Sequence, residues 1–491
     1  MIQMKEVSFQ YADSSEGVSE INLTIADGEC VVLTGPSGGG KTTLTRLING
    51  LAPSYYAGTL TGHMFLDKEP LAQILQHDLA RQVGSVFQDP KSQFFSSELA
   101  GEVAFACENY GLPVAEIRRR TDHAIAAFSL DGLQSQNLDA LSSGEKQRVA
   151  IASVYALHPN IYVCDEPTSN LDKKGTEQLA VILKKLKSEG CTLVIAEHRL
   201  AWLQGIADRF VYIRDGKILW ERSAGEMETL SAKQRRAEGL REIVPIRAYR
   251  NSDAAHGATL PVRKGIESEA GNLPLLASRI NRSPTLCVKE LSFQRKNKKI
   301  FGGLNLSLHA GQITAITGHN GAGKTSLALV LSGLWKESGG QVIVHGKKLR
   351  PAKRRKQVWY SSNDTGTQFF TNSVTKALLL HLERTEERLD RARNLLKKLG
   401  LYPYKDAHPA ALSGGQKQRL SIACGILSER QILIFDEPTS GLDGGNMEII
   451  AEVLRDTANL GKCILVITHD EELINRCCDC MVTMTESEST N

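Results

Sequence analysis

Short apolar runs alternate along this chain with longer stretches in which apolar residues recur every three or four positions. In the first half, the apolar runs have the length of buried strands and lie at residues 31–34, 161–164 and 192–196. Similar runs return in the second half at residues 313–317, 432–435 and 463–468. Continuous apolar runs are typical of strands covered on both faces, and their alternation with helices predicts a largely parallel α/β core in each half.

The helical pattern is strongest over residues 144–158, and Pro159 ends the predicted helix. Residues 88–141 are also mainly helical in pattern, which predicts a helical subdomain inserted into the first half. Neither half's strand runs occur in a middle segment that contains stretches of flexible-linker composition. The predicted organisation is a first domain at 1–225, a linker at 226–284 and a second domain at 285–491.

One eight-residue pattern occurs once in each half, after a strand-like run and before a helix-like run. The two copies are Gly35-Pro36-Ser37-Gly38-Gly39-Gly40-Lys41-Thr42 and Gly318-His319-Asn320-Gly321-Ala322-Gly323-Lys324-Thr325. In such a loop the glycines let backbone N–H groups surround a phosphate, and the helix that follows presents its positive end. The lysine reaches phosphate oxygens and the threonine hydroxyl ligates Mg²⁺. Each half is therefore predicted to hold one nucleotide.

The repetition extends to three further segments that keep the same spacing from one another in both halves. Leu141-Ser142-Ser143-Gly144-Glu145-Lys146-Gln147-Arg148 returns as Leu412-Ser413-Gly414-Gly415-Gln416-Lys417-Gln418-Arg419, Asp165-Glu166-Pro167-Thr168-Ser169 returns as Asp436-Glu437-Pro438-Thr439-Ser440, and His198 returns as His469. A repeat of this extent indicates the duplication of one unit.

An acidic pair follows the second strand run of each half. Asp165 and Asp436 end their strands beside the predicted phosphates, where a carboxylate holds Mg²⁺ through water. Glu166 and Glu437 come next and are the predicted general bases, which accept a proton from the attacking water.

A histidine and a helix start complete each predicted site. His198 and His469 follow the third strand run and are predicted to contact the γ-phosphate. The signature segments open helices whose N-termini face negative charge. The signature residues expected to contact the nucleotide in this way are Ser142, Gly144, Ser413 and Gly415.

The order of these motifs resembles the ATP-binding cassette (ABC) ATPase family over nearly the whole chain except the linker. The resemblance implies two tandem P-loop NTPase domains, each with a mixed or parallel sheet core and a helical subdomain. It also implies that the two halves pair head to tail within one chain, with each ATP between the phosphate loop of one half and the signature of the other. Tyr11 matches the aromatic residue that stacks on adenine, and Gln88 matches the loop glutamine that touches Mg²⁺.

The complete predicted site divides by role. The catalytic residues are Glu166, Glu437, His198 and His469. The ATP-binding residues are Tyr11, Gly35, Ser37, Gly38, Gly40, Lys41, Thr42, Thr43, Gln88, Ser142 and Gly144, with Gly318, Asn320, Gly321, Gly323, Lys324, Thr325, Ser326, Ser413, Gly415 and Gln416. The Mg²⁺ ligands are Thr42, Gln88, Asp165, Thr325 and Asp436.

The two halves depart unequally from the family pattern. Arg295 stands where Tyr11 stands in the first half, and Asn363 stands at the position of Gln88. The first half's signature carries Ser143 and Glu145 in place of the usual Gly and Gln. Under head-to-tail pairing all these departures fall on the site built on the second phosphate loop, which predicts slower turnover there.

A longer string resembles the ATPases of energy-coupling factor (ECF) transporters. It comprises residues 86–95 and then Glu102-Val103-Ala104-Phe105, and Gln368-Phe369-Phe370 echoes part of it. The resemblance implies an importer of a vitamin or another micronutrient in a prokaryote. It further implies an integral-membrane coupling subunit, a substrate-binding membrane subunit and a place on the cytoplasmic face of the membrane. Phe94, Phe95 and Glu102 are predicted to contact the coupling subunit, with core packing as the alternative for the two aromatics.

Two other functions remain open at this point. A tandem sugar-importer ATPase has a similar length but lacks the string around residues 86–95. A soluble ABC translation factor also carries two cassettes, and its basic helical linker contacts RNA. Here the prolines and glycines of the linker interrupt long helices, which disfavours nucleic acid as a partner.

Charge and cysteine content exclude several further classes. The chain has 59 basic and 55 acidic residues, a net charge of +4 that does not favour nucleic acid. The 10 cysteines show no regular disulfide framework, which predicts a reducing compartment, and those at 477–480 are interpreted as ordinary thiols. Neither a secretory signal nor an apolar run of about 20 residues is evident, so membrane association is expected to come from a partner.

Overall fold

The computed structural model describes residues 1–14, 16–169, 171–244, 260–261, 283–295, 298–380 and 382–484. The chain divides into two compact units. The first comprises Met1–Pro245 with Asp443–Gly445, and the second comprises Ile246–Leu442 with Asn446–Asn491. Within the described ranges each unit contains one six-stranded and one four-stranded sheet. The α/β architecture predicted for both halves is therefore confirmed.

The six-stranded sheet of the first unit has the order β10-β9-β3-β8-β7-β6. β10 pairs antiparallel with β9, and the other neighbours pair parallel. The second sheet, β2-β1-β4-β5, is antiparallel throughout. The strands are β1 (Ile2–Tyr11), β2 (Gly17–Ile25), β3 (Cys30–Thr34), β4 (Gly58–Leu66), β5 (Glu69–Pro70), β6 (Val83–Val86), β7 (Ile161–Asp165), β8 (Thr192–Ala196), β9 (Arg209–Arg214) and β10 (Lys217–Ser223).

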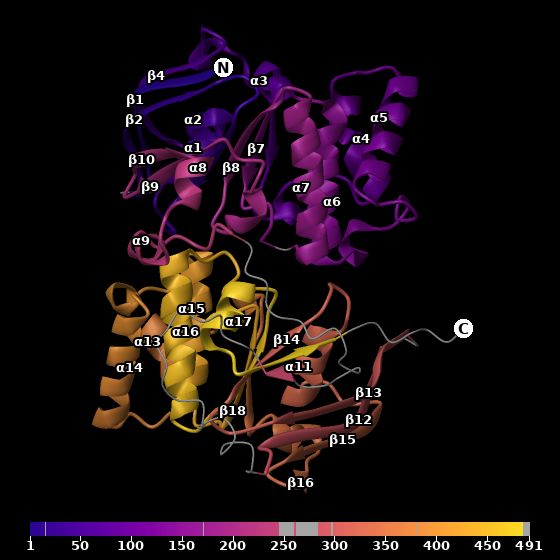
Figure 1. Cartoon of the computed structure of the whole chain (residues 1–491), viewed down its shortest axis with the longest axis vertical. Helices are drawn as coiled ribbons and strands as arrows, with labels where there is room; N and C mark the ends of the chain where they lie inside the picture. The colour runs from indigo at the N-terminus through magenta and orange to yellow at the C-terminus, as the bar shows by residue number, and fades with distance from the viewer. Residues whose placement is uncertain are drawn as a thin grey trace. The chain divides into compact units, whose positions relative to one another are not determined.

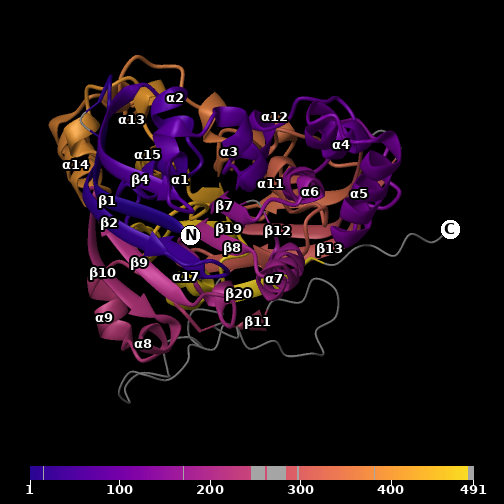
Figure 2. The same ribbon diagram turned by 90° about the horizontal axis from the view of Figure 1, so that it is seen from above.

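Helices cover the parallel sheet of the first unit. The predicted helical subdomain is present as α4 and α5, which lie on the side of this unit away from β1, β2 and β4 (Figures 1 and 2). α1 packs between the two sheets, where Leu44 and Leu47 join a core with Val7 and Val31. The helices are α1 (Lys41–Ile48), α2 (Leu51–Ser54), α3 (Gln76–Gln82), α4 (Leu99–Asn109), α5 (Val114–Ala127), α6 (Ser143–Leu157), α7 (Lys173–Ser188), α8 (Ala224–Glu228) and α9 (Ala232–Ala237).

The second unit repeats this plan. Its larger sheet has the order β11-β20-β14-β19-β18-β17, and its smaller sheet has the order β13-β12-β15-β16. The strands are β11 (Leu260–Pro261), β12 (Leu286–Arg295), β13 (Lys298–Leu308), β14 (Ile313–Thr317), β15 (Gly339–Val344), β16 (Lys347–Lys348), β17 (Val358–Ser361), β18 (Ile432–Asp436), β19 (Cys463–Ile467) and β20 (Cys480–Thr483). The helices are α11 (Lys324–Ser332), α12 (Pro351–Arg354), α13 (Val374–Leu378), α14 (Glu386–Lys398), α15 (Gly414–Leu427), α16 (Gly444–Asn459) and α17 (Glu471–Cys477).

The strand order brings the predicted motifs of each half to one edge of its sheet. β3, β8 and β7 are neighbours in parallel register, so their carboxyl ends meet there. The first phosphate loop follows β3, Asp165 ends β7, and Glu197 and His198 follow β8. β14, β19 and β18 repeat this arrangement in the second unit. Ligands of open α/β sheets bind at such carboxyl edges.

Part of the predicted linker packs as a folded extension of the first unit. Met227, Leu240 and Ile243 are buried in the core cluster that contains α6 and α7 residues. This part of the predicted linker is folded because apolar side chains recur within its charged sequence and are buried in the core. The predicted linker segments at 245–259 and 262–282 lie outside the described residues.

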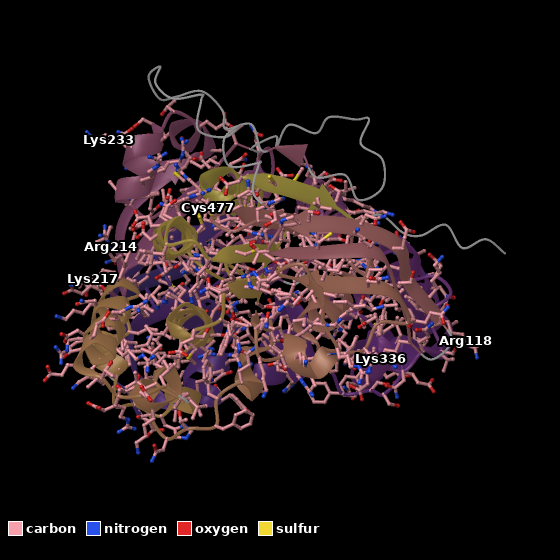
Figure 3. All side chains as sticks on the ribbon, turned by 90° about the horizontal axis from the view of Figure 1, so that it is seen from below. Arg118, Arg214, Lys217, Lys233, Lys336 and Cys477 are labelled. Carbon is pink, nitrogen blue, oxygen red and sulfur yellow. The ribbon has the colours of Figure 1, made fainter. Side chains whose placement is uncertain are left out.

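All ten cysteines are free thiols. Cys477 lies among the packed side chains of the second unit (Figure 3), which agrees with the interpretation of the cysteines at 477–480 as ordinary thiols. Within the described ranges, no three or more His, Cys, Asp and Glu side chains are grouped as a metal site. The helices described in the structure also include none with the length and apolar character needed to span a membrane.

Candidate functional site

The first phosphate loop connects β3 to α1. Gly35 has a φ of 134°, and a Cβ there would collide with the carbonyl oxygen of Ile213 on β9. Only glycine therefore fits where the loop leaves the sheet. Lys41 opens α1, and its buried ammonium donates to the carbonyl oxygens of Gly35 at 3.0 Å and Pro36 at 2.8 Å. Burial lowers the pKa of Lys41, although Glu166 acts in the opposite direction.

The second phosphate loop has the same geometry. Gly318 has a φ of 142°, and a Cβ there would collide with the carbonyl oxygen of Met484. Lys324 Nζ donates to Gly318 O at 2.6 Å and to His319 O at 2.9 Å. In both halves, carbonyl oxygens of the phosphate loop therefore hold the lysine ammonium within the loop, where a bound phosphate would also lie.

In the first half, the acidic pair meets both Gln88 and His198. Gln88 Nε2 donates to Glu166 Oε2 at 2.8 Å, and His198 Nε2 lies 3.4 Å from Glu166 Oε1. Burial acts to raise the pKa of Glu166, but the hydrogen bond from His198, the charges of His198 and Lys41 and the hydrogen bond from Gln88 outweigh it and lower the pKa. Glu166 is therefore ionised near neutral pH, as a general base must be.

The pKa shifts of the neighbouring Asp165 and His198 each favour the uncharged form of the group. Burial, and then the charge of Glu166, raises the pKa of Asp165 to about 6, although Thr42 donates a hydrogen bond to its carboxylate. Burial, and then the positive charge of Lys41, lowers the pKa of His198, although the contact with Glu166 acts in the opposite direction. The structure thus brings together Lys41, Thr42, Asp165, Glu166 and His198, as the sequence predicts.

The second half surrounds its acidic pair with different donors. Thr468 Oγ1 donates to Glu437 Oε2 at 3.2 Å, and His469 Nε2 lies 3.9 Å from Glu437 Oε1. Asp436 Oδ2 accepts from Thr325 Oγ1 at 2.8 Å and from the hydroxyl of Tyr360 at 3.2 Å. Burial raises the pKa of Asp436. The predicted counterpart of Gln88, Asn363, has an exposed side chain after β17.

Glu166 and Glu437 share an unusual backbone conformation. Their φ angles are 45° and 50°, in the left-handed region that non-glycine residues seldom occupy. Such a residue costs of order 1–3 kcal/mol, and this conformation recurs at functional sites. Its occurrence at the same position of both halves supports a functional interpretation of the pair.

The residues present fit a nucleotide phosphate chain and Mg²⁺. Each loop offers backbone N–H groups, a helix N-terminus and a buried lysine that donates to carbonyl oxygens of its own loop. Each half also places a threonine hydroxyl against a buried aspartate, which is the oxygen donor set that Mg²⁺ prefers. A divalent cation would offset the cost of ionising Asp165 beside Glu166.

Both signature segments begin helices through the same capping box. Ser142 caps α6 together with Glu145, and Ser413 caps α15 together with Gln416. Gln416 Oε1 accepts from the backbone N–H of Ser413 at 2.9 Å. Glu145 Oε2 accepts from the corresponding N–H of Ser142 at 2.8 Å and also from the Ser142 hydroxyl at 2.7 Å. Glu145, which stands where the family usually has Gln, therefore preserves the helix cap and also accepts a hydrogen bond from the Ser142 hydroxyl.

The residues predicted to contact adenine differ as the sequence indicates. The hydroxyl of Tyr11 donates to Thr43 Oγ1 at 3.3 Å and accepts from Arg46 Nη1 at 2.9 Å. In the second half, the guanidinium of Arg295 lies 4.6 Å from the ring centroid of Trp335. Arg46 was not predicted as part of this group, because its position on α1 carries no motif of its own.

The two cassette segments of the chain match a known protein family. The family model described as ABC transporter matches residues 18–169 and 301–440, which cover a cassette in each half. The chain belongs to the ABC transporter ATPase family. It contains two fused ABC cassettes, binds ATP and is an ATPase.

Two relatives align with this ABC ATPase over most of the length of both chains. It is 36% identical to a protein of Treponema denticola, provisionally named an ABC transporter ATP-binding protein, over 97% of this chain and 94% of the relative. It is 31% identical to a Bacillus subtilis protein, provisionally named HMP/thiamine import ATP-binding protein YkoD, over 99% of this chain and 90% of the relative.

A solved structure supports the fold alone. A model of ribosome-bound archaeal Pelota and ABCE1 superimposes with a TM-score of 0.68 at 21% identity, covering 99% of this chain and 77% of that chain. The similarity of fold therefore extends through both cassettes.

Proposed function

We propose that this ABC ATPase is the energy-coupling subunit of an ECF-type importer for a vitamin or another micronutrient. The resemblance of residues 86–95 to ECF ATPases supports this, as does the name of the B. subtilis relative, which refers to HMP and thiamine import. The observation that carries the proposal is a pair of grooves, one in each cassette, beside the segments that contain Gln88 and Asn363.

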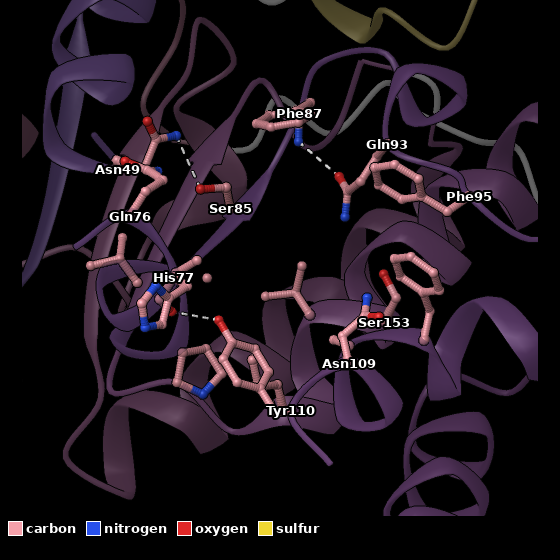
Figure 4. Close-up of a pocket in the computed structure, with 18 of the residues that line it drawn as sticks. Asn49, Gln76, His77, Ser85, Phe87, Gln93, Phe95, Asn109, Tyr110 and Ser153 are labelled. Carbon is pink, nitrogen blue, oxygen red and sulfur yellow. Dashed lines mark hydrogen bonds between the residues drawn. The ribbon is translucent and has the colours of Figure 1, made fainter. Parts of the chain in front are cut away.

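The groove of the first cassette has a volume of about 450 Å³ and is lined by aromatic and polar side chains. Figure 4 shows Phe87, Gln93 and Phe95 along one side, with Tyr110 and His77 opposite. Phe95 is 75% exposed, and its ring stacks on Phe105 with centroids 4.9 Å apart. An aromatic side chain this exposed does not serve core packing, which disfavours that alternative for Phe95.

The groove of the second cassette lies at the corresponding place and has a volume of about 770 Å³. Phe370, the counterpart of Phe95, is 88% exposed. Its lining includes the apolar residues Leu378 and Leu380 together with Cys424. Two grooves with an exposed aromatic at the rim fit two short amphipathic helices of a membrane subunit, since such helices bind by placing an apolar face in a groove.

Glu102 makes contacts within the first cassette that the sequence did not predict. Its carboxylate is only 2% exposed, and Oε2 accepts from the backbone N–H groups of Phe95 and Ser96, each at 2.8 Å. The carboxylate thus holds the loop that presents Phe95, and Ala377 in the second cassette offers no such acceptor. Glu102 also lines the groove, so its direct contact with the partner stays a prediction.

The proposed reaction uses two ATP sites built from both halves of the chain. Lys41 and Lys324 bind phosphate oxygens, and Glu166 and Glu437 accept the proton of the attacking water. Thr42, Gln88 and Asp165, or Thr325 and Asp436, would hold Mg²⁺, which would supply positive charge for the phosphates. The pairing of each phosphate loop with the opposite signature rests on the motifs, and hydrolysis at the cytoplasmic face then drives the membrane subunits.

Reconstitution tests this proposal. The chain would be co-expressed with the integral-membrane proteins encoded beside it, purified in detergent and placed in proteoliposomes. ATP-dependent uptake of radiolabelled HMP or thiamine, absent from a chain carrying Glu166→Gln and Glu437→Gln, is the expected result. Association with ribosomes instead of membrane proteins, or export rather than uptake, contradicts the proposal.

Two groove variants test the docking surface. Phe95→Ala and Phe370→Ala should each weaken assembly with the membrane subunit, because buried interface aromatics commonly contribute about 2 kcal/mol or more. ATP binding should be unchanged, because neither side chain touches a phosphate loop. Val181→Ala on α7 and Leu460→Ala serve as controls, since both side chains are exposed and apolar but line neither groove.

A further inference from the structure

In each cassette, a buried carboxylate ties the histidine segment to the loop that carries the candidate general base. The loop contributes Thr168 in the first cassette and Thr439 in the second, each two residues after the base. The carboxylate comes from Glu197, immediately before His198, in the first cassette. In the second cassette it comes from Asp470, immediately after His469. The same contact is therefore made from two different positions.

Glu197 is almost fully enclosed, with 3% exposure. Its Oε1 accepts from the hydroxyl of Thr168 and from the indole Nε1 of Trp202 at 3.1 Å, and its Oε2 accepts from the backbone N–H of His198 at 3.0 Å. The backbone N–H of Glu197 donates to Leu33 O at 3.0 Å, which continues the pairing of β8 with β3. One side chain thus connects the loop after β7, the segment after β8 and the following turn.

The second cassette reaches the same end with other residues. Asp470 Oδ2 accepts from the hydroxyl of Thr439 at 2.6 Å, and its Oδ1 caps α17 through the N–H groups of Glu472 and Leu473. Thr468 stands where Glu197 stands, donates to Glu437 and accepts from the backbone N–H of Asp470 at 3.0 Å. The sequences Glu197-His198-Arg199 and Thr468-His469-Asp470 therefore place one carboxylate on opposite sides of the histidine.

We propose that Glu197 and Asp470 are positioning residues, each of which fixes the distance between the histidine and the general base of its own cassette. His198 and Glu166 lie on separate segments after neighbouring strands. The backbone N–H of Glu166 donates to Ala196 O at 2.8 Å, and side-chain contacts such as that of Glu197 with Thr168 add to this bond between the segments. A misplacement of about 1 Å at such a site can cost 100-fold in rate. The inference concerns ATP hydrolysis within each cassette and is independent of what the transporter carries.

The decisive experiment moves the carboxylate of the first cassette from before the histidine to after it, as in the second cassette. In the full-length chain, Glu197→Ala and Glu197→Thr should each lower kcat by about tenfold or more, with little change in KM. The set Glu197→Thr, Arg199→Asp and Trp202→Leu gives the first cassette the residues of the second, including Leu473. This triple variant should recover at least half of the kcat that Glu197→Thr loses, because the carboxylate is restored from the other side of the histidine.

A double-mutant cycle gives an independent readout. Thr168→Ala should lower kcat to a similar extent as Glu197→Ala, and the double variant should be no worse than either single variant, because both remove one contact. ATP binding and the unfolding temperature are measured for every variant. The reciprocal set, Thr468→Glu with Asp470→Arg, against Asp470→Ala provides the same test in the second cassette if a first-cassette variant does not fold.

Two results would overturn the proposal. One is a kcat for folded, ATP-binding Glu197→Ala and Asp470→Ala chains equal to that of the unmodified chain. The other is a triple variant that folds and binds ATP but stays as slow as Glu197→Thr, since a purely general packing role for Glu197 predicts no rescue from Arg199→Asp.

Discussion

Gln88 Nε2 lies 2.8 Å from Glu166 Oε2 and donates a hydrogen bond to it. This bond joins the loop that borders the first groove to the candidate general base of the same cassette. In the second cassette Thr468, which directly follows β19, donates to the carboxylate of Glu437. The groove segment and the base are therefore in direct contact in the first cassette, which gives a partner bound there a short physical route to the reaction.

The first prediction is that ATP hydrolysis depends unequally on the two bases. Glu166→Gln should remove most steady-state turnover, whereas Glu437→Gln should leave a measurable fraction. The reasons are the 3.4 Å contact of His198 with Glu166 against 3.9 Å for His469 with Glu437, and the sequence departures assigned to the second site. Loss of a general base costs roughly 10²–10⁴-fold at its own site.

The measurement for this prediction is the ATPase rate of each variant under saturating ATP, with nucleotide binding as the control for folding. Equal losses in the two variants would remove the support for asymmetry. A larger loss from Glu437→Gln would reverse the assignment of the faster site.

The second prediction concerns the serine hydroxyl of the altered signature. A hydroxyl has one proton, and Ser142 gives it to the Glu145 carboxylate at 2.7 Å. Glu145→Gln keeps the helix cap but weakens this bond by about 1 kcal/mol, because hydrogen bonds to charged groups are stronger. Under the proposed pairing of signatures with opposite phosphate loops, Glu145→Gln should lower KM for ATP several-fold.

Gln416→Glu is the matched variant, because it introduces the same group into the other signature. It should raise KM for ATP in the full-length chain, opposite in direction to Glu145→Gln. Unchanged KM values in both variants would show that neither signature hydroxyl contributes to ATP binding.

The third prediction is a pH-dependent stability due to Glu197. Burial raises the pKa of this carboxylate most strongly, and the charge of Glu166 raises it further, while the hydrogen bonds that it accepts lower it. The net effect raises the pKa from 4.5 to about 7. An acid whose pKa is raised by folding contributes stability that is complete below pH 4.5 and is lost as the pH rises through 7. The shift corresponds to at most about 3 kcal/mol.

Thermal unfolding of the unmodified chain and of Glu197→Gln measures this effect. The unfolding temperature of the unmodified chain, measured relative to that of the variant, should fall by several degrees between pH 5 and pH 8. Glu108→Gln, which changes an exposed carboxylate on α4, is the control. A difference that is constant over this range, or that grows with pH, contradicts the predicted ionisation of Glu197.

Local residue patterns were enough to predict the cassette motifs and their occurrence in both halves. Each phosphate loop is contiguous, and the apolar strands before it and before Asp165 and Asp436 are continuous runs, so local pattern specifies both. The parallel α/β class, the helical subdomain at α4 and α5 and the capped signature helices follow from periodicity and capping residues for the same reason.

The contacts that hold each general base could not be predicted from local patterns. Gln88 and Glu166, Glu197 and Thr168, and Tyr360 and Asp436 are pairs far apart in the sequence. Whether such side chains meet depends on strand order, on the register of neighbouring strands and on the path of each loop beyond the sheet edge. The same dependence enclosed the carboxylate of Glu102, which the sequence had placed at the partner surface. These distances are set by packing among non-neighbouring segments, and no local pattern of residues encodes them.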